Sequence, residues 1–156
     1  MMPTRLANVE DSEVLAQMLH DFNEEFGDPS PGVEVLASRV RRFIDRSTKI
    51  YLLAREDGAA SAGGFAQISF TPSIWSEGPI AMIDELYVRP ALRRRGLGQE
   101  LMDSILALAR EQGANGVEVV TGEDDLGARA LYEKTGFRNE IEGEKNSRSL
   151  FYEREL

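Results

Sequence analysis

The sequence predicts a single α/β domain, residues 1–156, on a mixed, mostly antiparallel sheet of about six to seven strands with helices on both faces. Three observations support this fold class. The length of 156 residues suits one domain with a sizeable core. Apolar residues recur at helical spacing in some segments and in short extended runs in others. The expected order is strand, two helices, three strands, helix, strand, helix and two strands.

The first half of the chain accounts for the first six elements. Residues 4–8 read as a short strand, and Asp11-Ser12 offers an N-cap to a helix that ends in the Gly/Pro-rich residues 27–32. A second helix follows, with arginines beside its apolar stripe. Asp57-Gly58 is a hairpin signal between strands. The three strands expected here are residues 49–55, 63–71 and 80–88.

The second half begins with a long helix that starts near Gly96 and ends at Gly113. Residues 117–121 form a short, nearly uncharged strand, which we expect in the centre of the sheet. Asp124 or Asp125 then caps a helix that ends at Thr135-Gly136. Two closing strands are expected after it, at residues 137–141 and 149–155.

Composition narrows the function. Hydrophobic residues make up 42% and charged residues 29%, as in soluble globular proteins. Without cysteine the chain has no disulfide, thiolate zinc site or Cys nucleophile, and one histidine, His20, disfavours a metal site or a Ser-His-Asp triad. A net charge of −9 disfavours nucleic acid. No export signal or membrane-spanning run is visible, so we expect a cytoplasmic protein without a membrane partner.

The segment between the third strand of the first half and the long helix carries the clearest chemical signal. It reads Arg93-Arg94-Arg95-Gly96-Leu97-Gly98. The start of a helix offers unpaired N–H groups and a positive dipole end, glycine lets the backbone approach an anion, and arginine adds charge. These features predict a pyrophosphate site; the alternative is a capped turn with solvated arginines. Position 101 is leucine, so the dinucleotide-binding Gly-x-Gly-x-x-Gly pattern is absent.

This stretch resembles the Gcn5-related N-acetyltransferase (GNAT) family, whose signature is Arg or Gln, two residues, Gly, one residue, and Gly or Ala. Residues 128–137, Ala-Arg-Ala-Leu-Tyr-Glu-Lys-Thr-Gly-Phe, look like a second signature of this family. The family commonly has Asn at the position of Asp125, where we expect helix capping instead. The resemblance implies splayed middle strands, acetyl-CoA as co-substrate and no metal. It implies cofactor contacts from Leu86, Tyr87, Val88, Arg93, Arg94, Arg95, Gly96, Leu97, Gly98 and Gln99.

Acetyl transfer to an amine requires removal of a proton from the amine and delivery of one to the leaving thiolate. The resemblance places the phenol of Tyr132 near the coenzyme sulfur, as the acid; the alternative is a packing role in the core. Glu85 lies at the mouth of the splayed strands and is our candidate base, with a water relay as the alternative. Strand alternation puts its neighbour Asp84 on the opposite face.

The acceptor is expected to be a small cationic amine. Two acidic clusters support this: one on the first helix (Asp21, Glu24, Glu25, Asp28) and one at residues 123–125. Because the cofactor is an anion held by a basic loop, these acids should lie elsewhere and form a negative funnel. The segments that contain them are also similar to aminoglycoside 3-N-acetyltransferases. The alternative for each carboxylate is a solvated surface.

Three functions remain open: an acetyltransferase for a small amine such as a polyamine or aminosugar, a protein Lys or N-terminal acetyltransferase, and a non-catalytic acyl-CoA-binding module. For the first, we expect direct attack of the amine in a ternary complex. Trp75 and Phe70 could serve a homodimer contact or the acceptor pocket. The sequence does not decide between these two roles.

Overall fold

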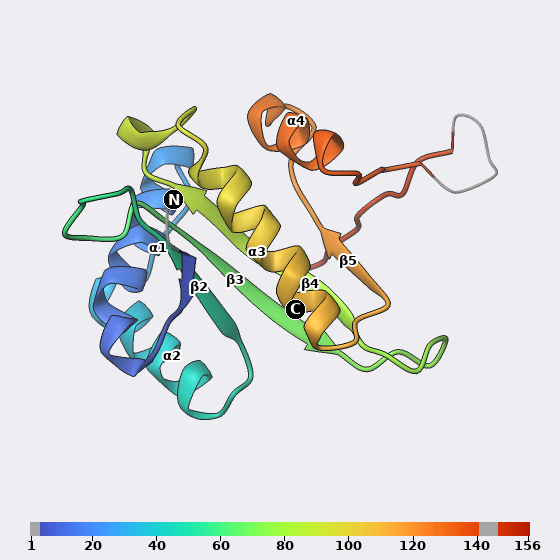
Figure 1. Ribbon diagram of the computed structural model, residues 1–156, viewed down its shortest axis with the longest axis horizontal. Coiled ribbons are helices and arrows are strands. Elements are labelled where there is room, and N and C mark those ends of the chain that lie inside the picture. The colour runs from blue at the N-terminus through green and yellow to red at the C-terminus, as the bar shows by residue number, and fades with distance from the viewer. Residues whose placement is uncertain (1–3, 141–146) are drawn as a thin grey trace. The chain divides into compact units, whose positions relative to one another are not determined.

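The structure is a computed structural model that describes residues 4–140 and 147–156. The chain divides into two compact units, one ending at Val119 and one beginning at Val120. The first unit contains β1 (Thr4–Leu6), α1 (Ser12–Phe26), α2 (Val33–Asp45), β2 (Ile50–Ala54), β3 (Gly64–Thr71), β4 (Ile80–Val88), α3 (Leu97–Glu111) and β5 (Gly116–Val119) (Figure 1). The second unit contains α4 (Leu126–Lys134).

The first unit is built on a sheet of five strands in the order β1-β2-β3-β4-β5. Neighbouring strands from β1 to β4 are antiparallel, and β5 runs parallel to β4. The predicted α/β class with a mixed sheet is therefore confirmed. The predicted count of six to seven strands is wrong, since the described residues form five.

The missing strands are those expected to close the sheet after α4. Described residues in the ranges 137–141 and 149–155 form no strand, and one isolated bridge joins Glu140 to Arg148; Ile141 lies outside the described residues. In the first range Arg138, Asn139 and Glu140 are polar and offer no apolar face to bury, and in the second range the apolar side chains of Leu150, Phe151 and Tyr152 are exposed. Neither range therefore adds a strand beyond β5 among the described residues. For the same reason β5, which we expected in the centre, is an edge strand of the described sheet. One domain over residues 1–156 stays a prediction.

Helices α1 and α2 cover one face of the sheet. Their buried side chains pack with every second residue of the central strands, because side chains two residues apart on a strand point to the same face. This core consists of Leu15, Met18, Val40, Tyr51, Leu53, Phe65 and Tyr87. The helical stripe predicted for α1 is confirmed, although the residue that caps its entry is Asn8, through a short 3-10 turn at Val9–Asp11.

Helix α3 packs against β2, β3 and β4, and Figure 1 shows it running along the sheet in front of β3 and β4. Its buried residues Leu97, Leu101 and Ile105 are the predicted stripe. Gly64 makes this close packing possible: a Cβ there would lie 2.7 Å from the backbone oxygen of Tyr87 and 3.3 Å from a methyl group of Leu101. The helix therefore approaches the sheet closely at Gly64 of β3, which pairs with Val88 at the end of the strand that leads into the arginine-rich turn.

Candidate functional site

The turn between β4 and α3 is the predicted pyrophosphate site. Arg94 and Gly96 have positive φ angles of 65° and 94°, and α3 begins at Leu97. No side chain caps this helix, so its first N–H groups are available to an anion at the positive end of the dipole. A 15-residue helix with an uncapped start, a glycine at its N-cap and adjacent arginines fits the pyrophosphate of acetyl-CoA.

The last residues of β4 are where we expect the second cofactor contact. β5 pairs only with Ile80–Ile83, so the half of β4 from Asp84 to Val88 has no strand partner on that side among the described residues. This divergence is the predicted splay, and it leaves backbone groups free to bind an extended ligand. The side chain of Tyr87 is buried, so its contact with a cofactor would come from the backbone.

Two cofactor candidates at the start of α3 would also act through their backbone. The side chain of Leu97 is 1% exposed and belongs to the core. The side-chain amide of Gln99 donates to Asp103 at 2.8 Å, along the helix. Both residues lie in the first turn of α3, where main-chain N–H groups lack intrahelical acceptors.

Two arginines of the turn are engaged by carboxylates. Arg93 donates two hydrogen bonds to Glu25, at 2.5 and 2.6 Å, and its guanidinium lies 5.7 Å from the ring centroid of Tyr87. Arg95 pairs with Glu56 at 3.2 Å. Arg94 forms no ion pair in the described part of the chain. The pairs are partly exposed, so an anionic ligand can compete with them.

Two acids of the α1 cluster, Asp21 and Glu25, lie against this basic turn, and for them our expectation of a separate position is wrong. Asp21 pairs with Arg89 at 3.4 Å, as Glu25 does with Arg93. Asp21 and Glu25 are four residues apart and therefore share the helix face that meets the turn. Their charges are compensated, so they do not form a negative funnel for a cation.

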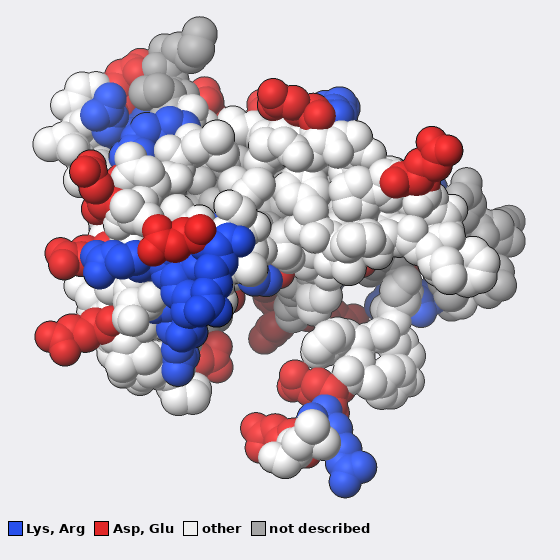
Figure 2. Space-filling model, turned by 90° about the horizontal axis from the view of Figure 1, so that it is seen from below, with Lys and Arg blue, Asp and Glu red and all other residues white. Residues whose placement is uncertain are grey.

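Helix α2 changes the charge distribution further. Arg39, Arg41 and Arg42 are exposed on it, and a shallow hollow is lined by Arg39 and Arg42. Figure 2, which views the molecule from the side where α2 lies in Figure 1, shows Lys and Arg gathered into one block with acidic side chains around it. The surface of the first two helices is therefore of mixed charge.

A bulge in β4 places two consecutive carboxylates on one face. Gln67 of β3 pairs with Glu85, and the next residue, Ile68, pairs with Ile83, so Asp84 is an extra residue in β4. The Asp84 carboxylate accepts hydrogen bonds from Gln67 at 3.4 Å and Ser69 at 3.1 Å. The prediction that Asp84 and Glu85 point to opposite faces is wrong, because strict alternation fails at a bulge.

These two acids belong to a group that we call the polar cluster. It lies on the face of the sheet that α1 and α2 cover, and consists of Lys49, Tyr51, Gln67, Ser69, Asp84 and Glu85. Lys49 pairs with Asp84 at 3.1 Å. Glu85 accepts no hydrogen bond or ion pair from any described residue. Burial raises the pKa of the Glu85 carboxyl above its ordinary value, and the neighbouring charge of Asp84 raises it further.

Sequence reasoning missed four members of the polar cluster: Lys49, Tyr51, Gln67 and Ser69. A signal was present in the sequence. Lys49 and Tyr51 are two residues apart in or beside β2, and Gln67 and Ser69 are two residues apart in β3, while most other residues of these strands are apolar. Polar residues two apart on a buried strand indicate a polar strip on one face. Which strips meet depends on the register between strands, and this register is visible only in the structure.

In the second unit, Tyr132 and Asp125 occupy α4 and its N-terminus. Tyr132 is 9% exposed, and its ring lies 5.8 Å from that of Phe137. Packing is thus one role of Tyr132, and the acid role stays a prediction. The Asp125 side chain accepts a hydrogen bond from the Ala128 N–H at 3.1 Å, which confirms the expected capping role. Glu123 pairs with Arg148 at 3.3 Å.

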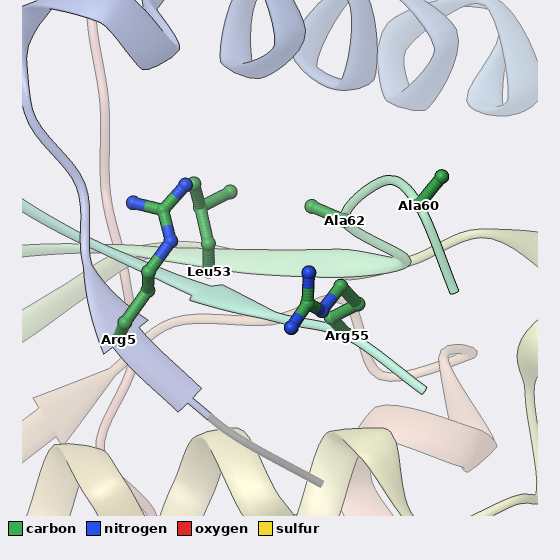
Figure 3. A pocket seen from close by; sticks show the side chains of 5 residues that line it. All are labelled: Arg5, Leu53, Arg55, Ala60 and Ala62. Atoms are coloured by element: carbon green, nitrogen blue, oxygen red, sulfur yellow. The ribbon is translucent and has the colours of Figure 1, made fainter. Parts of the chain in front are cut away.

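A separate small cavity of about 140 Å³ lies beside β1 and β2 (Figure 3). Arg5 and Leu53 line it together with Arg55, Ala60 and Ala62. Arg5 is held by two hydrogen bonds to Asp11, at 2.7 and 2.8 Å. The cavity is smaller than the ~300 Å³ of typical ligand sites, so we do not assign the acceptor to it.

Comparison with known proteins decides the family. The model of the acetyltransferase (GNAT) family matches residues 15–137. The chain belongs to this family. The resemblance predicted from the arginine–glycine motif and the Leu-Tyr motif is therefore confirmed, and with it the enzyme class, since GNAT proteins transfer acetyl groups from acetyl-CoA.

Individual relatives agree with this assignment. A solved structure from Arthrobacter sp. FB24, described as an acetyltransferase, is 40% identical to this chain and has a TM-score of 0.88. The match covers 99% of this chain and 96% of the Arthrobacter chain. An uncharacterized N-acetyltransferase of Bacillus subtilis, YhfO, is 26% identical over 89% of this chain and 91% of its own. AAC(6′)-Iy, bound to a bisubstrate analogue of CoA and acetylneamine, is 18% identical over 100% and 99% of the two chains, with a TM-score of 0.76; at that identity it shows the fold alone.

Two features are absent from the described residues, a membrane-spanning helix and a metal-binding group. No helix in residues 4–140 or 147–156 combines the length and apolar character needed to cross a membrane. Within the same residues, no three His, Cys, Asp or Glu side chains are grouped so as to hold a metal ion. His20 is instead hydrogen-bonded through Nδ1 to the Ser30 hydroxyl at 2.8 Å.

Proposed function

We propose that the protein is an acetyl-CoA-dependent N-acetyltransferase that acts on a primary amine of a small cationic molecule, such as a polyamine or aminosugar, by direct attack in a ternary complex. The observation that carries this proposal is the adjacent pair Asp84 and Glu85, which the bulge places on one face of β4 where this strand diverges from β5. A partly buried pair of carboxylates attracts an ammonium group and provides a base for it.

The cofactor contacts proposed for the first unit rest on backbone geometry. The N–H groups of Gly96, Leu97, Gly98 and Gln99 would hold the pyrophosphate, with charge from Arg93, Arg94 and Arg95. The free edge of β4 at Leu86, Tyr87 and Val88 would hold the pantetheine arm. Bound acetyl-CoA would supply the acetyl group as an activated thioester.

Glu85 is the proposed base. The acceptor enters as an ammonium ion, which must lose a proton before its nitrogen lone pair can form a bond to carbon. The Glu85 carboxylate has no other hydrogen-bonding partner among the described residues, and its raised pKa brings it closer to neutral pH, where a general base is most effective. The proton thus moves from the amine nitrogen to a carboxylate oxygen of Glu85, directly or through water.

Tyr132 is the proposed acid. A thiolate leaves when the carbon–sulfur bond breaks, and the phenol of Tyr132 would give it a proton, since the two groups have ordinary pKa values near 8.5 and 10. This role follows from the position of Tyr132 in the family's Leu-Tyr motif.

Two further expectations, a cytoplasmic location and a homodimer, stay predictions from the sequence.

A cationic acceptor agrees with the net charge of −9 and with the acetylneamine-containing analogue bound by AAC(6′)-Iy. The polar cluster now replaces the α1 acids as the attracting group. Lys49 offsets part of its negative charge, so the attraction is directed at Glu85 rather than spread over the surface. The α2 arginines would repel a polycation from that side.

The test is a thiol-release assay with acetyl-CoA and a panel of polyamines, aminoglycosides, neutral and acidic amino acids, and Lys peptides. We expect cationic small amines to be preferred, and Glu85→Gln and Tyr132→Phe each to lower turnover by ~10² to 10⁴. Glu118→Gln is the matched control, because Glu118 is an exposed residue of the neighbouring strand β5.

Each other outcome contradicts part of the proposal. A preference for neutral or acidic amines would remove the cationic acceptor, and a preference for Lys peptides would indicate a protein acetyltransferase. Coenzyme A binding with no turnover on any amine would indicate a non-catalytic module. Wild-type turnover by Tyr132→Phe would leave Tyr132 with a packing role only.

A further inference from the structure

Tyr51 lies in one row with the proposed base. It pairs with Gln67 across β2 and β3, and Gln67 pairs with Glu85 across β3 and β4. Residues that pair across neighbouring strands point to the same face of a sheet. The phenol of Tyr51 and the carboxylate of Glu85 are therefore on the same face, the one covered by α1 and α2.

The Tyr51 hydroxyl is buried and lacks a partner in the described part of the chain. The residue is 1% exposed, and its oxygen forms no hydrogen bond with any described residue. Buried polar groups are nearly always hydrogen-bonded, so an exception in a well-packed core calls for an explanation. A phenylalanine here would fill the same space without a buried polar atom, so packing alone does not explain the hydroxyl.

The acceptor atoms around this hydroxyl are not equivalent. Asp84 is already bonded: Ser69 donates to Oδ1 at 3.1 Å, and Lys49 donates to Oδ2 at 3.1 Å. Glu85 has no donor among the described residues. A donor without an acceptor and an acceptor without a donor thus stand in the same row of the sheet.

The charge of Glu85 is close enough to act on the Tyr51 phenol. The pKa of the Tyr51 phenol is raised by burial first, and then by the charges of Asp84 and Glu85. The helices that cover this face contribute apolar side chains to the core cluster that contains Tyr51, among them Leu15, Met18 and Val40.

The other charged side chains of the two covering helices are either paired or exposed. On α1, Asp21 and Glu25 are held by Arg89 and Arg93, and His20 is bonded to Ser30. The arginines of α2 are exposed. Lys49 and Asp84 are thus the charged groups that act on this row.

We propose that Tyr51 is a positioning residue for Glu85: its hydroxyl donates, through one bridging water, to the Glu85 carboxylate and keeps that carboxylate ionised and directed at the amine. A bridge is needed because β2 and β4 are separated by β3, or roughly 9–10 Å between backbones. The role of this hydrogen bond in catalysis rests on the proposed function. The presence of the hydrogen bond can be tested even if the protein shows no turnover.

The test is a titration of Glu85 by carbon-13 NMR in the wild type and in Tyr51→Phe. A hydrogen bond donated to a carboxylate favours its charged form, so loss of the donor should raise the Glu85 pKa by about one unit. The acid limb of the pH profile of kcat/KM should move to higher pH by the same amount. Because the Glu85 pKa would then lie further above its unfolded value, Tyr51→Phe should lower the melting temperature at pH 7 but not below pH ~4, where the carboxyl is protonated in both states.

Thr4→Val is the matched control. The Thr4 hydroxyl is likewise buried and has no partner in residues 4–140 and 147–156, but it lies on β1, opposite Ala54. Its removal should leave the Glu85 titration unchanged. An unchanged titration in Tyr51→Phe would overturn the proposal, as would equal shifts in both variants.

A measurement on the wild type covers the case in which Tyr51→Phe does not fold. The Cζ resonance of Tyr51 should follow the same pH midpoint as Glu85, and a Cζ resonance that is flat through that midpoint refutes the bridge. Failure of the proposed function appears separately, as absence of acetyl transfer by the wild type to every amine in the panel.

Discussion

The arginine-rich turn and the polar cluster both contain carboxylates near cations, yet they differ in burial and in charge balance. In the turn, Arg93 and Glu25 are 38% and 28% exposed and neutralise each other. In the polar cluster, Lys49 neutralises Asp84, while Glu85 is left with a charge but no partner among the described residues. The turn is thus electrostatically satisfied at the rim, and the cluster carries an unsatisfied charge beneath two helices.

This difference indicates that the two regions have different functions. A solvated ion pair is easily exchanged for contacts with an anionic ligand, because water screens both states. An unpaired carboxylate in a partly buried place is unstable when ionised, and it therefore gains by accepting a proton. The turn is suited to binding and the cluster to proton transfer.

The largest expected effect is in the turn. Gly96→Asp should lower the affinity for coenzyme A by about 100-fold or more, because it puts a negative charge at the proposed pyrophosphate site and disturbs backbone N–H donors. Calorimetry with coenzyme A measures the effect. Gly113→Asp is the control: its φ of 70° is also left-handed, a Cβ there meets nothing within 4 Å, and it follows the other end of α3. Equal affinity in the two variants would refute the site.

The second prediction concerns the cluster and has an unusual sign. Glu85→Gln should be more stable than the wild type at pH 7, by about 1 kcal/mol. The folded-state pKa of Glu85 is raised above its unfolded value, so folding is penalised as pH rises from the unfolded value through the folded one. Below pH ~4 the carboxyl is protonated in both states, and the gain should vanish. Urea denaturation at both pH values checks this, and a uniformly destabilised variant would contradict it.

The smallest effect should come from the same change, Glu to Gln, at the α1 residue that pairs with the turn. Glu25→Gln should destabilise the fold by less than about 1 kcal/mol, since its pair with Arg93 is partly exposed. The loss should shrink in 1 M salt, where the screening length is ~3 Å, whereas the effect of Glu85→Gln should persist. Identical signs and salt responses for the two variants would remove the distinction between the regions.

The predictability of the two regions also differs, for a geometric reason. The turn is contiguous in sequence, and strand 80–88 and the start of α3 agree with the structure because they depend on local patterns. The cluster combines side chains from residues 49 to 85. The extra residue at Asp84 arises from the register between two strands, so alternation along β4 alone gave the wrong face.

The remaining misses have a similar origin. The sequence predicts strands at residues 137–141 and 149–155, but a strand forms only where a partner edge and a buried face are available. The pairing of Asp21 and Glu25 with the turn likewise depends on which face of α1 meets β4. Charge composition predicts that acids are present and does not predict what neutralises them.

The bulge at Asp84 also makes the site sensitive to insertion or deletion of a single codon in β4. A regular strand shows only every second side chain on one face, so two neighbouring acids on the same face require one additional residue. Gain or loss of a single in-frame codon therefore switches β4 between one carboxylate and two, while Glu85 keeps its place opposite Gln67. Among homologues of unequal β4 length, the chains shorter by this one codon should retain the base but lack the neighbour that raises its proton affinity.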